Sequence, residues 1–226
     1  MSFNIKNFKL NTKNLQVSPK IITDGLVLYY DASNTKSIIS GNTLCTDLSK
    51  NLNNFSQING VGYDTNDFGS LVFDGSNDYI DVSPNLNIGT VYTIDMWVKL
   101  NDLTSRVWFG GINTTYYHMN FLNGLLYSRA TTLVGLTFGA TTGTWFNAVL
   151  VRNGNGVYAY KNGVFTDSDL SSGWLTNQFT VYRIGASPSG FYSNGNLASI
   201  KIYNKALTQS EITQNYNALK NRFDLW

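Results

Sequence analysis

Paired carboxylates are the first chemistry to look for in this chain, because two of them about 5 Å apart form the catalytic centre of retaining glycoside hydrolases. The sequence contains a single glutamate, Glu211, and it stands in a Thr-Gln-Ser-Glu segment that is typical of a helix start. Asp95 lies inside an expected strand between Ile94 and Met96, with no acidic residue two positions away. The carboxylates therefore argue against hydrolytic chemistry of this kind.

His118 is the only histidine and Cys45 is the only cysteine. A Ser-His-Asp triad would have to use His118, which stands in Tyr-Tyr-His-Met-Asn without a recognisable catalytic motif. No Cys/His cluster indicates zinc, and no glycine-rich phosphate loop follows an expected strand. Cys45 cannot form an intramolecular disulfide, and we expect it to be a small buried residue. We therefore expect no catalytic residue and no enzymatic activity.

Oxygen donors gather in the loop Asp74-Gly75-Ser76-Asn77-Asp78. Calcium binds six to eight oxygen ligands, so Asp74, Asn77 and Asp78 are candidate ligands of a structural calcium ion, and no other cofactor is expected. The alternative interpretation is that the two aspartates accept hydrogen bonds from the backbone of a tight turn. We favour the turn.

Aromatic residues in loops could bind a sugar, because flat rings stack on sugar faces and loops are exposed. The candidates for glycan binding are Trp108, Tyr116, Tyr117, Trp174 and Tyr192. Trp97 and Trp145 lie within expected strands and are assigned to the core. Each candidate also has a plain interpretation as a packing residue.

The first 23 residues differ from the rest of the chain, because they carry lysines and no acidic residue. One interpretation is an arm that docks on a partner through Lys6, Lys9, Lys13 and Lys20. The other is a loose tail or an edge strand. We expect an N-terminal arm over 1–23 and one domain over 24–226.

Short apolar runs separated by Gly and Asn turns recur from Gly25 onward and predict β-strands. Strong examples are Leu26 to Asp31, Ser70 to Gly75, Tyr79 to Ser83, Thr144 to Arg152 and Asn196 to Asn204. Tyr92 to Leu100 alternates, with Tyr92, Ile94, Met96, Val98 and Leu100 on one face. Asn162-Gly163 predicts a tight hairpin turn. Many short strands without alternating helices indicate an all-β antiparallel sandwich or jelly roll.

One short helix is expected at the C-terminal end. Thr208 and Glu211 form a capping box, and Ile212, Tyr216 and Leu219 then share one face. Lys220 and Arg222 are expected in its last turn, where positive charge complements the helix dipole.

Composition limits the class of protein. Charged residues make up 13%, about half the usual share, and the net charge of +2 is too small for a nucleic-acid binder. No apolar run approaches the roughly 20 residues that span a bilayer, and the N-terminal residues lack the apolar segment of a signal peptide.

Four stretches together resemble a known family. They are GLVLYYDASN, LVFDGSNDYIDV, TWFNAVLVRNGNGVYAYKNGV and NGNLASIKIYNKALTQSEI, which occur in the family's order and span about 25–222. The chain is identified as a member of the laminin G-like, concanavalin A-like lectin/glucanase superfamily. Its opening and the ending NYNALKNRF resemble virion structural proteins of tailed phages.

This resemblance implies a concanavalin A-like fold and, first, a non-enzymatic virion structural protein, as a capsid decoration or a fibre- or tail-associated component. It would be made in the host cytoplasm, contact capsid or tail proteins and form a homo-oligomer. The alternative is an extracellular or cell-surface module that binds host-surface glycans. A glycoside hydrolase is the third and least supported reading.

Overall fold

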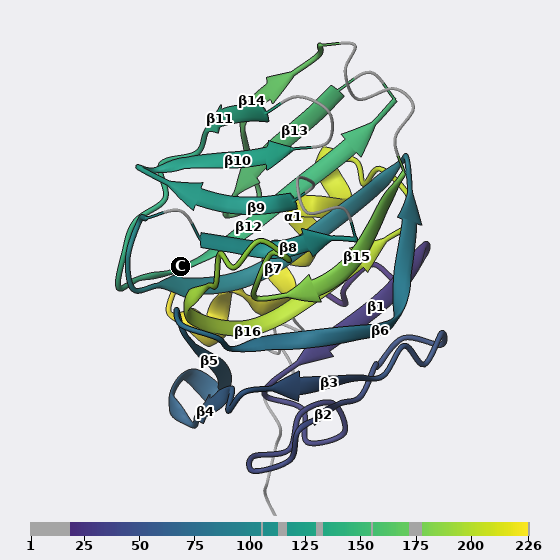
Figure 1. The fold of residues 1–226 in the computed structure, drawn as a ribbon. Helices are drawn as coiled ribbons and strands as arrows, with labels where there is room; N and C mark the ends of the chain where they lie inside the picture. The colour runs from purple at the N-terminus through teal and green to yellow at the C-terminus, as the bar shows by residue number, and fades with distance from the viewer. Residues whose placement is uncertain are drawn as a thin grey trace, which may run out of the picture.

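The computed structural model of the protein describes residues 19–104, 106–112, 117–129, 133–154, 156–171 and 178–225. These residues form two antiparallel sheets packed face to face, with one helix on the outside of one sheet (Figure 1). The expected β-sandwich with a short C-terminal helix is confirmed.

Sheet A has the strand order β14-β13-β12-β7-β16-β5-β4 in the described part of the chain, and β1 pairs with β16 as well. Its strands are β1 (Leu26–Asp31), β4 (Gly62–Asp64), β5 (Ser70–Asp74), β7 (Tyr92–Leu100), β12 (Trp145–Asn153), β13 (Gly156–Lys161), β14 (Val164–Asp169) and β16 (Asn194–Tyr203).

Sheet B has the order β11-β10-β9-β8-β15-β6-β3-β2 over the same described ranges. Its strands are β2 (Leu44–Cys45), β3 (Phe55–Ile58), β6 (Tyr79–Gly89), β8 (Arg106–Gly111), β9 (Tyr117–Leu122), β10 (Leu125–Arg129), β11 (Leu133–Thr137) and β15 (Phe179–Ile184).

The central strand β7 shows why the chain forms a sandwich. Successive side chains of a strand point to opposite faces, and the expected face of β7, from Tyr92 to Leu100, is buried between the sheets. The other face carries Thr93, Asp95 and Trp97, and these side chains are also buried. Both faces of β7 are therefore covered.

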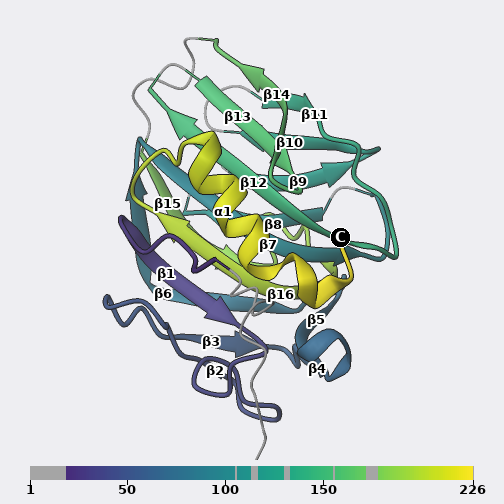
Figure 2. The ribbon, with the colours of Figure 1, turned by 180° about the vertical axis from the view of Figure 1, so that it is seen from behind.

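Helix α1 (Gln209–Leu219) and the 3₁₀ turn η4 (Lys220–Phe223) cover the outer face of sheet A (Figure 2). Trp97 stacks on Phe223, with ring centroids 4.3 Å apart, and on Tyr216 at 5.6 Å. Stacked rings of this kind add to the free energy that burial alone contributes. No helix in the part of the chain that the structure describes is long and apolar enough to cross a membrane.

The capping box at the start of α1 is confirmed. The Thr208 side chain accepts a hydrogen bond from the Glu211 backbone N–H, and the Glu211 carboxylate accepts one from the backbone N–H of Thr208. The expectation that Lys220 and Arg222 lie in the last turn of the helix is wrong, because both belong to η4. Arg222 instead donates to the Asp31 carboxylate at 2.7 Å and to the Gly69 carbonyl, which joins the C-terminal end to sheet A.

A buried polar cluster lies between α1 and sheet A. The Asp95 carboxylate accepts hydrogen bonds from the side-chain amides of Asn147, at 2.7 Å, and Asn215, at 3.0 Å. The ammonium of Lys201 lies 3.3 Å from the same carboxylate. Because Asn215 belongs to α1, this cluster fixes how the helix lies on the sheet.

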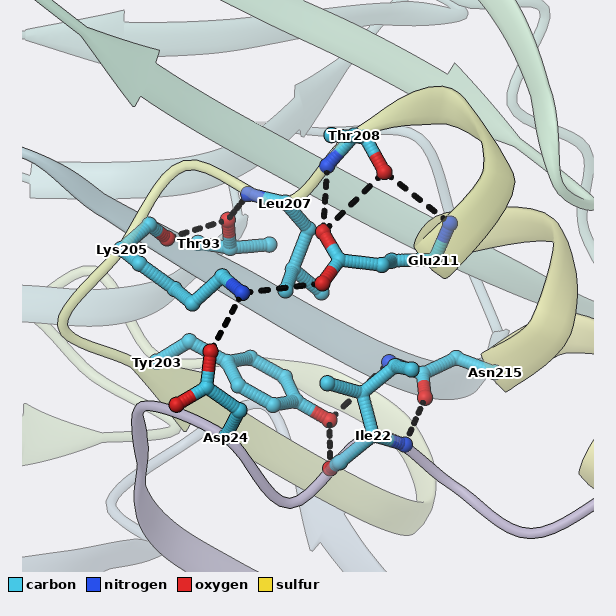
Figure 3. Close-up of polar contacts among 9 residues, drawn as sticks. All are labelled: Ile22, Asp24, Thr93, Tyr203, Lys205, Leu207, Thr208, Glu211 and Asn215. Atoms are coloured by element: carbon cyan, nitrogen blue, oxygen red, sulfur yellow. Dashed lines mark hydrogen bonds and ion pairs between the residues drawn. The ribbon is translucent and has the colours of Figure 1, made fainter.

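The segment 20–23, assigned above to the N-terminal arm, is bonded to the same end of the domain (Figure 3). The Ile22 backbone N–H donates to the Asn215 side chain, and the Tyr203 hydroxyl donates to the Ile22 carbonyl. The Lys205 ammonium lies between the carboxylates of Asp24 and Glu211, at 2.8 Å from each. The chain therefore joins the sandwich before residue 24.

The expected Asn-Gly turn is confirmed between β13 and β14. Asn162 has φ of 52° and Gly163 has φ of 78°, so both residues adopt the left-handed backbone conformation that this turn requires. The carbonyl of Gly163 accepts hydrogen bonds from Gln209 and Thr213 of α1. The turn thus holds the β13–β14 hairpin against the helix.

Candidate functional site

Of the sequence-based glycan candidates, the structure describes Trp108, Tyr117 and Tyr192. The prediction that Trp108 stacks on a sugar is wrong, because Trp108 is 0% exposed and packs edge-on against Phe73 in the core. Tyr117 is half-buried on β9, and Tyr192 is half-buried beside a short bridge to Ala186. Tyr116 and Trp174 lie outside the described residues.

The Asp74–Asp78 loop is a self-contained turn. One Asp74 oxygen accepts from the backbone N–H groups of Ser76 and Asn77, and an Asp78 oxygen accepts from the backbone N–H of Asp74. Asp78 is buried, whereas Asp74 and Asn77 are exposed. The carboxylates serve the turn instead of converging on one point, so this donor set does not fit calcium. No group of three or more His, Cys, Asp or Glu side chains suited to a metal occurs among the described residues.

Of the candidate docking lysines, Lys20 is exposed, and its backbone carbonyl accepts a hydrogen bond from the Gln214 side chain on α1. Lys6, Lys9 and Lys13 lie outside the described residues. Docking by this segment stays a prediction.

An aromatic surface that the sequence did not single out lies on the outer face of sheet A. On β13, Val157 and Ala159 face the core between the sheets, whereas Tyr158 and Tyr160 face outward. Phe165 of β14 pairs directly with Tyr160, so it faces the same side. We call Tyr158, Tyr160 and Phe165 the aromatic shelf.

The shelf continues the apolar layer under α1. Tyr158 pairs with Val151 and Tyr160 with Val149, and both valines are buried under the helix. A shallow cavity of about 300 Å³ lies over this part of the sheet. Its lining residues are Val151, Asn153, Tyr158, Tyr160, Ala206, Leu207 and Thr208. The segment before α1 therefore forms one wall and the tyrosines form the floor.

The rings of the shelf are fixed and accessible. The ring centroids of Tyr160 and Phe165 are 5.7 Å apart in an edge-to-face arrangement, and Phe165 is 47% exposed. Tyr158 and Tyr160 stand two residues apart on one strand, which spaces them by about 6.8 Å. The shelf thus offers several ring surfaces in a row.

Polar groups around the shelf are uncharged and available. Among the described residues, no hydrogen-bond partner is found for the hydroxyls of Tyr158 and Tyr160 or for the side-chain amide of Asn153, which is exposed. Partial burial, with the neighbouring Tyr158, raises the pKa of Tyr160, so its hydroxyl stays protonated and can donate at neutral pH. No charged side chain lines the cavity in the described structure.

The local sequence did contain a signal for this site. In Gly-Val-Tyr-Ala-Tyr-Lys, small apolar residues alternate with tyrosines, and a strand places these two sets on opposite faces. Whether α1 covers the tyrosines could not be read from that alternation.

Comparison with known proteins identifies the family. Residues 74–213 match the model described as the concanavalin A-like lectin/glucanases superfamily. No curated protein matches the chain significantly.

Solved structures share the fold at low identity. Domain 4 of AbnA, an extracellular GH43 arabinanase from Geobacillus stearothermophilus solved in complex with arabinotriose, has a TM-score of 0.69 at 18% identity over 86% of this chain and 100% of that chain. The binding domain of botulinum neurotoxin serotype D has a TM-score of 0.64 at 17% identity, over 86% of this chain and 52% of that chain. That of Paraclostridial Mosquitocidal Protein 1 has a TM-score of 0.61 at 17% identity, over the same shares.

The chain thus spans all of the arabinanase domain but about half the length of the toxin binding domains. The sandwich, its strand order and the match over most of the chain agree. The protein belongs to the concanavalin A-like lectin/glucanases superfamily.

Proposed function

We propose that this domain is a non-catalytic glycan-binding module that holds a neutral oligosaccharide on the aromatic shelf. The observation that carries the proposal is the row of outward rings, Tyr158, Tyr160 and Phe165, beside free hydroxyl and amide groups. Aromatic faces bury the apolar side of a sugar ring, and uncharged donors and acceptors bind its hydroxyls. Domain 4 of AbnA, which shares this fold, was solved in complex with arabinotriose, and this supports an oligosaccharide as the ligand class.

The first test removes the rings of the shelf. Tyr158→Ala and Tyr160→Ala are each expected to weaken binding of a responding oligosaccharide about tenfold, because one lost ring contact is worth roughly 1 kcal/mol or more. A glycan array identifies the oligosaccharide, and calorimetry measures the change. Tyr160→Phe keeps the ring and removes only the hydroxyl, so it separates stacking from hydrogen bonding.

Tyr127→Ala is the matched control, since Tyr127 is a half-buried tyrosine on β10 of the other sheet. It should leave the affinity unchanged. A flat response of the wild-type protein across a broad array, or equal losses in the control, would sink the proposal.

We propose, second, that the protein is a structural component of a tailed-phage particle. This proposal is supported by the resemblance of the opening and the ending of the sequence to virion structural proteins of tailed phages. The segment 1–18 would act as the docking arm, because residues 20–23 are bonded to Gln214, Asn215 and Tyr203 of the domain. The same proposal includes a homo-oligomer.

Two truncations separate docking from folding. Deleting 1–18 should abolish incorporation into particles while the domain stays folded. Deleting 1–23 should in addition lower the thermal midpoint, because it removes the hydrogen bonds of Ile22 and the packing of Ile21 and Ile22. Incorporation is followed by immunoblotting of purified particles and oligomeric state by light scattering. Normal incorporation of the 1–18 deletion would contradict the arm.

A further inference from the structure

A second cavity lies at the edge of the sandwich opposite the aromatic shelf. In sheet A the shelf is on β13 and β14, whereas β4 is the strand at the other end of the order. The cavity, of about 290 Å³, opens between the loop 39–43 before β2 and residues 60–63, which include the first two residues of β4. We call it the edge cleft (its strands lie in the lower part of Figure 1).

Two of the residues that line the edge cleft are glycines with left-handed backbone conformations. Gly41 and Gly60 have φ of 78° and 90°, and a Cβ built on either would meet no atom within 4 Å. Ile38 and Leu71 are buried at the inner end of the cleft and supply an apolar surface.

Gln57 of β3 lines the cleft and is 8% exposed. Its backbone N–H donates to the Thr43 carbonyl at 2.7 Å. Its side-chain amide donates to the Sγ of Cys45 at 3.5 Å, and sulfur is a weak acceptor. Burial raises the pKa of that thiol to about 12, so it is uncharged at neutral pH and does not strengthen the contact.

The amide of Gln57 therefore has unused capacity. Its carbonyl oxygen accepts no hydrogen bond from the described residues. This oxygen is not among the enclosed side-chain atoms that lack a partner, so it is accessible from the cleft. An accessible carbonyl oxygen on an otherwise buried side chain is a fixed acceptor to which a ligand in the cleft can donate.

The other lining groups define the ligand. Ser40, Asn42 and Thr43 contribute hydroxyl and amide groups, and no charged side chain lines the cleft in the described structure. The Asn42 side-chain oxygen already accepts from the Leu44 backbone N–H at 2.9 Å, which leaves its amide protons to donate. An uncharged ligand with several hydroxyls and an apolar face matches this lining.

We propose that the edge cleft is a second binding site, which takes a single neutral sugar residue whose hydroxyls bond to the amides of Gln57 and Asn42. The apolar face of the sugar would rest against Ile38 and Leu71. This site does not depend on the shelf, because the two lie at opposite ends of sheet A.

The test observes the Gln57 side chain directly. In ¹⁵N-labelled protein its side-chain amide signals are assigned by their disappearance in Gln57→Met. Glucose, galactose, mannose and arabinose are then titrated one at a time. At least one of them is expected to shift the Gln57 signals in a saturable way, and the same shift should occur in the Tyr158→Ala/Tyr160→Ala protein.

Gln57→Met should abolish binding at the cleft without lowering the thermal midpoint, since it keeps the volume of the side chain and removes the under-bonded amide. Gln178→Met, at an exposed position, is the control and should bind normally. Absence of any shift of the Gln57 signals with all four sugars overturns the proposal. A shift that disappears in the shelf variant also overturns it, because the sugar would then bind only at the shelf.

Discussion

Replacing Asp95 by asparagine is expected to lower the free energy of unfolding by about 3–5 kcal/mol, the usual cost of breaking a buried ion pair from one side. Asp95 and Lys201 are both 0% exposed, and their charged groups lie 3.3 Å apart beneath α1. The substitution keeps the shape of the side chain but leaves the Lys201 ammonium in a low-dielectric environment without its counter-ion. It also turns a new amide donor toward the amides of Asn147 and Asn215.

Urea denaturation measures the loss in free energy of unfolding. A double-mutant cycle then shows how much of that loss comes from the interaction between Asp95 and Lys201. Lys201→Met alone should cost less, because the Asp95 carboxylate retains hydrogen bonds from two side-chain amides. The double variant removes both charges and should be more stable than Asp95→Asn alone. A loss below about 1 kcal/mol for Asp95→Asn would show that the pair is solvated and that α1 does not seal this part of the sheet.

Acid is expected to destabilise the domain already between about pH 6.5 and about pH 4.5, because of His118. Burial between the sheets, with the charge of Arg152, lowers the pKa of His118 to about 3. The ring centroids of His118 and Phe179 are 4.0 Å apart. The two ring nitrogens of His118 contact the hydroxyls of Tyr92 and Ser128. These neutral partners suit a neutral imidazole.

The direction of the effect follows from proton uptake. In the unfolded chain the histidine pKa is about 6.5, so below that pH the unfolded state binds a proton that the folded state binds only near pH 3. Stability is therefore complete above about pH 6.5 and decreases as the pH falls toward 3. At about pH 4.5 the loss should be about 2.5 kcal/mol.

Urea unfolding at a series of pH values measures this dependence. The chain has one histidine, so His118→Gln should remove the decrease in stability between about pH 6.5 and about pH 4.5, whatever its effect on absolute stability. Carboxylates with a lowered pKa lose their contribution to stability mainly below about pH 4, outside this window. These carboxylates are Asp31, Asp102, Asp167 and Glu211. A wild-type profile that is flat over the window would falsify the burial of a neutral His118.

Much of the fold was predictable because its determinants are local. The alternation in Tyr92–Leu100, the left-handed Asn162-Gly163 turn and the Thr208/Glu211 capping box each depend on residues a few positions apart. The order of four family motifs then indicated the superfamily, which the match over 74–213 confirms. These features required no knowledge of which strands are neighbours.

The candidate sites were not predictable in the same way. Trp108 and Tyr158 both stand in short strand-like segments, yet Trp108 is buried against Phe73 and Tyr158 faces a cavity. The edge cleft likewise depends on how the connection into β4 lies against the loop before β2, two segments about twenty residues apart.

The sequence by itself determined the strands, turns, helix cap and superfamily of this protein, since each follows from backbone preferences and side-chain periodicity within a short segment. The tertiary structure decided which outward side chains remain accessible. Helix α1 covers Asp95 and Trp97 on β7 but leaves Tyr158 and Tyr160 half-exposed two strands away. The physical reason is that burial depends on which distant segment packs over a face, and alternation along one strand carries no information about that segment.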